Sequence, residues 1–101
     1  MPFVRVAAVS ELPDGELIEV VHNGSPVAVC RVAGQVHAVS GVCPHPGGPL
    51  GQGALEGGMI TCPWHAWPFD LKTGACALNG EVRIPVYSVR VTDSDVFVEL
   101  P

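Results

Sequence analysis

Two short pairs of possible metal ligands, Cys43-Pro-His45 and Cys62-Pro-Trp-His65, constrain this 101-residue chain more than any other feature. The segment that carries them, Val42 to Asp70, also holds both tryptophans, and it lacks the periodicity of either a strand or a helix. Such a segment needs something besides a hydrophobic core to hold it in place. We therefore expect a bound metal centre there, with no regular strands inside the segment.

The rest of the chain alternates short apolar runs with turn residues, a pattern typical of antiparallel strands. Valine dominates the apolar residues, and the 12 Gly and 10 Pro supply turns. The sequence predicts one all-β domain over residues 1–101, an antiparallel β-sandwich or barrel whose last strand closes against the first. Strands are expected at 3–8, 17–22, 27–33, 36–39, 82–91 and 95–100, with a hairpin turn at Asn23-Gly24.

The net charge of −5 argues against a nucleic-acid partner, because phosphates require a basic surface. It suits weak, salt-sensitive encounters with basic protein surfaces. No run of 18 apolar residues is present, so no membrane span is expected. The start of the chain alternates like a strand and does not resemble a signal peptide, which predicts a cytoplasmic protein.

The four candidate ligands, Cys43, His45, Cys62 and His65, fit two kinds of centre. Two thiolates and two imidazoles can bind zinc in a closed tetrahedral site. They can also bind a Rieske-type [2Fe–2S] cluster, in which two Cys hold one iron and two His hold the other. Each pair here supplies one Cys and one His, as two facing loops around a cluster require, whereas zinc fingers usually pair Cys with Cys.

Neighbouring residues fit a cluster. Glycines at Gly47-Gly48 and Gly57-Gly58 would let backbone N–H groups approach its sulfurs. Trp64, Trp67 and Phe69 would shield it from water. Four other residues with ligand chemistry are expected to have structural or surface roles; they are Cys30, Cys76, His22 and His37.

The two boxes, Cys43-Pro-His45-Pro-Gly-Gly-Pro-Leu50 and Cys62-Pro-Trp-His65-Ala-Trp-Pro-Phe-Asp70, resemble those of the Rieske ferredoxin family. The resemblance covers essentially the whole chain and is closest to the ferredoxins of bacterial aromatic-ring dioxygenases. It implies a Rieske fold with a cluster-binding subdomain of two loops inserted at about residues 41–80. It also implies one [2Fe–2S] cluster per chain, with Cys43 and Cys62 on the inner iron and His45 and His65 on the outer iron.

By the same resemblance the chain is an electron carrier and not an enzyme. It would be a monomer that takes electrons from a flavin-dependent reductase and docks on a terminal oxygenase through its histidine edge. Apolar residues would surround that edge; they are Pro46, Pro49, Leu50 and Trp67. Many family members have a proline-rich loop after the second box, whereas residues 75–83 here contain no proline.

Three alternatives stay open at this point. The small subunit of an assimilatory nitrite reductase resembles the same fold and would co-purify with a large subunit. A zinc-stabilised interaction module would be colourless, whereas a Rieske protein is red-brown. A redox or oxygen sensor would use the same cluster without relaying electrons.

The resemblance also predicts the electrochemical class. High-potential members of the family carry an extra Cys in each box, and these form a disulfide that braces the loops. The matching positions here are Gly48 and Trp64. Those members also place Ser and Tyr hydroxyls near the cluster, where this chain has Trp67 and Phe69.

Because fewer hydrogen-bond donors leave the reduced state less stabilised, we predict a midpoint potential at the low end of the Rieske range, about −150 mV. Potentiometric titration of the purified protein measures it directly. A clearly positive potential would contradict the assignment to the low-potential class.

Overall fold

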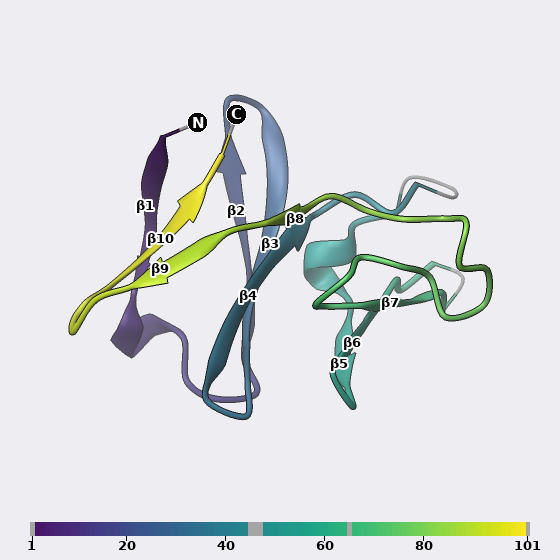
Figure 1. Ribbon diagram of the computed structural model, residues 1–101, viewed down its shortest axis with the longest axis horizontal. Coiled ribbons are helices and arrows are strands. Elements are labelled where there is room, and N and C mark those ends of the chain that lie inside the picture. The colour runs from purple at the N-terminus through teal and green to yellow at the C-terminus, as the bar shows by residue number, and fades with distance from the viewer. Residues whose placement is uncertain (1, 45–47, 65, 101) are drawn as a thin grey trace.

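The computed structural model describes residues 2–44, 48–64 and 66–100 of the chain (Figure 1). These residues form short strands and two three-residue 3-10 helices, and none of them lies in an α-helix. The elements follow in this order: β1 (Phe3–Ala8), η1 (Val9–Glu11), β2 (Leu17–His22), β3 (Ser25–Val32), β4 (Gln35–Ser40), η2 (Leu50–Gln52), β5 (Ala54–Glu56), β6 (Met59–Thr61), β7 (Pro68–Asp70), β8 (Val86–Tyr87), β9 (Val89–Val91) and β10 (Asp95–Glu99).

The strands make three antiparallel sheets, in the orders β1-β10-β9, β2-β3-β4-β8 and β5-β6-β7. The pairing of β10 with β1 brings the two ends of the chain together, as the sequence predicts. The all-β antiparallel fold is therefore confirmed. No helix among the described residues is long and apolar enough to cross a membrane.

Strand β3 lies at the centre of the molecule because both of its faces are buried. Ala28 and Cys30 face one hydrophobic core, and Val27 and Val29 face the other. This follows from the strand geometry, in which successive side chains point to opposite faces. The first core joins the β2-β3-β4-β8 sheet to the β5-β6-β7 sheet, and the second joins it to the β1-β10-β9 sheet.

Two tight turns set the register of this central sheet. Asn23 and Gly24 both have positive φ, at 51° and 79°, and so link β2 to β3 in the predicted two-residue hairpin turn. Ala33 and Gly34 repeat that conformation between β3 and β4.

The expectation that residues 42–70 lack regular strands is wrong. They contain the β5-β6-β7 sheet, in which Leu55 pairs with Ile60 and Ile60 pairs with Phe69. Each strand is only three residues long, which is too short for period-2 alternation to be recognised in a sequence. This sheet and both ligand-bearing loops fall inside residues 41–80. We still predict, as from the sequence, that the chain is a single domain and that this range is its cluster-binding subdomain.

The single strand expected at 82–91 is also wrong. The chain instead forms β8, which pairs with β4, and then β9, which pairs with β10 in a different sheet. Pro85 has no N–H to donate, and its carbonyl accepts a hydrogen bond from Ser40 just before β8 begins. The break at Ser88 lets the chain pass from the central sheet, at β8, to the terminal sheet, at β9, and both strands are labelled along this path in Figure 1.

Candidate metal centre

The first loop leaves β4 and returns to η2 through a narrow, hydrogen-bonded neck. The Cys43 N–H donates to the Gly48 carbonyl at 2.9 Å, and Val42 lies opposite Pro49 in an isolated bridge. Closer to the sheet, the Leu50 N–H donates to the Gly41 carbonyl at 2.9 Å. Cys43 is thus fixed at the base of the loop that carries His45.

The second loop has the same construction. Cys62 follows directly after β6, and its N–H donates to the Trp67 carbonyl at 3.0 Å. The Ala66 N–H donates back to the Cys62 carbonyl at 2.9 Å. In both loops the cysteine N–H is bonded to the carbonyl five residues later, so each cysteine closes the neck of its own loop.

The two loops pack directly against each other at Gly48. A β-carbon built on Gly48 would lie 2.8 Å from the Cys62 Sγ and 3.0 Å from Cγ of Trp64. These separations are too short for any side chain at position 48, although the φ of this glycine is not positive. Glycine is therefore required here by contact between the loops and not by the backbone conformation.

The same contact explains how the loops are braced without a disulfide. By the resemblance described above, Gly48 and Trp64 match the positions at which high-potential Rieske proteins carry their disulfide cysteines. The structure shows that these positions are adjacent, since the indole ring packs on the Gly48 backbone. A glycine–tryptophan contact thus occupies the place of the covalent link.

The donor atoms present fit an iron–sulfur centre. Cys43 and Cys62 are both fully buried in the first core, at one end of the molecule. The first loop leaves the central β2-β3-β4-β8 sheet and the second leaves the β5-β6-β7 sheet, and the two pack together at Gly48, so both thiols would bind a group held between the loops. His45 and His65, the other two predicted ligands, lie outside the described residues. That all four residues bind the metal stays a prediction.

The remaining cysteines are part of the core. Cys30 is fully buried in β3, and burial raises the pKa of its thiol to about 11, so it stays protonated and is a poor metal ligand. Cys76 is buried where its N–H donates to the Val82 carbonyl at 2.8 Å. Both positions match the structural role that the sequence predicts.

The three aromatic residues predicted to shield the centre differ in burial. Phe69 is fully buried in β7, and Trp67 is half-buried against the first core. Trp64 is 57% exposed, so it covers Gly48 with one part of its ring and offers the rest to solvent or to a partner.

Two expectations about the surroundings of the loops are wrong. Leu50 is fully buried in the first core, so it cannot form part of a docking surface. Gly57 and Gly58 form the turn of the β5–β6 hairpin, where they border Val32 at the other end of the sheet. Because three residues of extended strand separate them from Cys62, their N–H groups lie too far away to reach a centre at the cysteines.

The segment without prolines, residues 75–83, follows the turn that ends β7. The Asp70 carboxylate forms this turn by accepting from the N–H groups of Lys72 at 2.7 Å and Thr73 at 3.1 Å, and these bonds lower its pKa.

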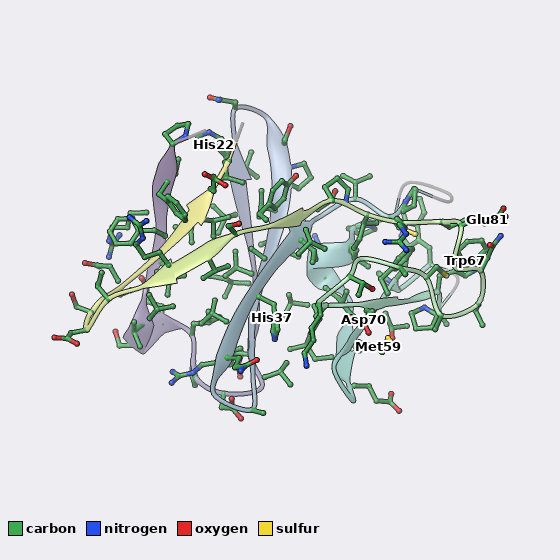
Figure 2. All side chains as sticks on the ribbon, in the orientation of Figure 1. His22, His37, Met59, Trp67, Asp70 and Glu81 are labelled. Carbon is green, nitrogen blue, oxygen red and sulfur yellow. The ribbon has the colours of Figure 1, made fainter. Side chains whose placement is uncertain are left out.

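The segment then returns along β7, where the Ala77 N–H donates to the Pro68 carbonyl at 2.9 Å. Val82 and Trp67 pack on the same core, so this segment is held against the core without prolines. Figure 2 shows Trp67 and Glu81 together at this end.

A family model described as the Rieske [2Fe–2S] domain matches residues 2–88. The chain belongs to this family. Its cofactor is therefore a Rieske-type [2Fe–2S] cluster, which agrees with two buried thiols at the necks of two packed loops.

Similar Rieske proteins cover nearly the whole chain. The 3-phenylpropionate/cinnamic acid dioxygenase ferredoxin subunit of Shigella boydii serotype 4 is 36% identical over 97% of this chain and 93% of its own. A chain in a solved complex of reduced oxygenase and oxidised ferredoxin in carbazole 1,9a-dioxygenase is 34% identical, with a TM-score of 0.87 over 95% of this chain and 91% of its own. A putative NADH-dependent nitrite reductase small subunit from Mycobacterium tuberculosis is 29% identical, with a TM-score of 0.86 over 99% of this chain and 96% of its own.

The steric role of Gly48 is the feature that sequence reasoning missed, because a glycine in a glycine-containing loop gives no signal of what lies opposite. We predict that Gly48→Ala forces the Cys62 thiol or the Trp64 ring to move. Overpacking of this kind costs about 1–3 kcal/mol, which corresponds to a fall in Tm of roughly 5–15 °C for a domain of this size. Thermal unfolding and the visible spectrum of the cluster would both report the change.

Gly80→Ala is the matched control, because Gly80 has no positive φ and nothing lies within 4 Å of its built β-carbon. Equal Tm and equal spectra for the two variants would show that the loops do not depend on the Gly48 contact.

Proposed function

We propose that this Rieske protein is the ferredoxin of a ring-hydroxylating oxygenase system, and that it carries single electrons from a flavin-dependent reductase to a terminal oxygenase. The observation that carries the proposal is the arrangement of the two loops. They bring two buried thiols to one end of a small domain and expose apolar side chains around them. A partner that docks on this end comes within a few residues of the cysteines.

When bound, the cluster supplies a single one-electron couple. The role of the chain is to hold and shield it. Cys43 and Cys62 would bind the inner iron from the loop necks, and His45 and His65 would bind the outer iron. Phe69 and Trp67 exclude water from the core side of the thiols. The absence of hydroxyls at these two positions limits hydrogen bonding to the reduced state, which favours a low potential.

The exposed surface around the loops suits a transient protein contact. Trp64 and Leu78, which is 66% exposed, are large apolar side chains at this end. Exposed apolar groups of this size commonly mark interaction sites. The net charge of −5 would steer the approach to basic surfaces on either partner.

The oxygenase is supported as a partner by the solved carbazole 1,9a-dioxygenase complex, whose ferredoxin chain shares the fold and a third of the residues of this protein. The flavin-dependent reductase is the electron donor that the resemblance to dioxygenase ferredoxins implies. We also propose that the protein is a monomer in the cytoplasm, where its thiols would stay reduced.

A second candidate is the small subunit of an assimilatory nitrite reductase, favoured by the fold shared with the Mycobacterium tuberculosis protein. That subunit would be permanently bound to a large catalytic subunit. Co-purification of a tightly bound sirohaem protein from the source organism would support this candidate, and isolation of the protein alone would support the free ferredoxin.

The relay can be tested by mixing the reduced protein with the oxidised oxygenase of carbazole 1,9a-dioxygenase and with that of 3-phenylpropionate dioxygenase. We expect the protein to pass one electron per chain to at least one of them, at a rate that falls as salt screens the encounter. Stopped-flow absorbance of the two cluster spectra measures both the rate and the stoichiometry.

Apoprotein of the same chain serves as the control for electrons carried by the reductant alone. Failure to reduce either oxygenase, with the cluster intact and reducible, would contradict the proposed function.

A further inference from the structure

A hollow of about 450 Å³ lies beside the two loops, between them and the β2–β3 hairpin. The hairpin supplies Val21 and Pro26 to its lining, the first loop supplies Val42, and the second loop supplies Trp64. In Figure 1 this hairpin rises at the top of the view, with η2 to its right. The hollow is continuous with the loop end, because Gly48 and Pro49 also line it.

The lining gathers much of the exposed apolar surface of the protein. Six large hydrophobic side chains are exposed among the described residues, and three of them, Val21, Val42 and Trp64, border this one hollow. Val21 is 64% exposed although it lies within a strand. Such clustering is typical of a docking surface and not of scattered surface residues.

One carboxylate defines the electrostatic character of the hollow. Among the described residues that line the hollow, Glu19 has the only ionisable side chain. A β-carbon built on the buried Gly51 would lie 2.9 Å from a Glu19 carboxylate oxygen, so the Glu19 side chain packs over this glycine of η2. No basic side chain in the described parts of the chain pairs with it, since the one ion pair found there joins Arg5 to Asp95.

These features together select a basic side chain as the occupant. The aliphatic stem of a lysine or arginine would lie along Val21 and Val42, and its cation would reach Glu19 and the exposed face of Trp64. An acidic group would be repelled by Glu19. A purely apolar group would bury this carboxylate beneath the partner without a counter-ion, which is unfavourable.

We propose that this hollow, defined by Glu19, Val21, Val42 and Trp64, receives a lysine or arginine side chain of the terminal oxygenase when the two proteins dock. The inference rests on the proposed function, because the partner is the one to which that function delivers electrons. This contact lies beside the two ligand loops. It would hold the oxygenase in one orientation, with the end of the loops facing the site on the oxygenase that accepts the electron.

The test compares two variants in the hollow with two matched variants outside it. Glu19→Gln removes the carboxylate and Val21→Ser removes the apolar surface. Glu56→Gln and Val91→Ser make the same changes at exposed positions that do not line the hollow, Val91 being 49% exposed. The Kd of each holoprotein is measured by calorimetry against the oxygenase that native protein reduces fastest, at low and at high salt.

Each variant in the hollow should weaken binding about threefold at low salt, and the two controls should bind like native protein. Glu19→Gln should also reduce the salt dependence of Kd. The cluster spectrum and midpoint potential should not change in any variant, because neither Glu19 nor Val21 belongs to the ligand loops.

Unchanged Kd values for both hollow variants, with native protein still reducing the oxygenase, would overturn this inference and leave the proposed function standing. An effect of Val21→Ser without one of Glu19→Gln would overturn the basic occupant. Native protein that neither binds nor reduces an oxygenase would overturn the proposed function and this inference together.

Discussion

The close packing of Gly48 on Cys62 and Trp64 is the contact on which the site depends. It joins two loops that come from different sheets, and it leaves no room for a side chain at position 48. Each loop is also closed by its own cysteine, whose N–H bonds the carbonyl five residues later. The backbone of both loops therefore fixes the position of each thiol at the base of its loop.

The scaffold makes that contact possible because β3 is buried on both faces. On one face its side chains pack in the core shared with the terminal strands. On the other face they pack in the core shared with the β5-β6-β7 sheet and the loops. The loop end is thereby supported by a continuous core that includes Cys43, Cys62 and Phe69. A small domain can in this way hold an iron–sulfur cluster at one end without a disulfide.

The family, the strand pairs and the Asn23-Gly24 turn were predictable because each leaves a local signal in the sequence. The β5-β6-β7 sheet was not, since its strands are too short for alternation to show. The burial of Leu50, the Gly48 contact and the hollow at Glu19 depend on what lies across space from each residue. Local sequence does not record that, and so the docking surface that we propose contains Trp64, Val42 and Val21 instead of the buried Leu50.

The ligand set is tested most directly by electron–nuclear double resonance on the reduced protein grown with ¹⁵N-histidine. All four histidines are labelled, but two of them, His22 and His37, lie outside the ligand boxes. The account predicts strong coupling of the unpaired electron to two imidazole nitrogens, those of His45 and His65. Coupling to no nitrogen, or a colourless protein that contains zinc and gives no signal, would contradict it.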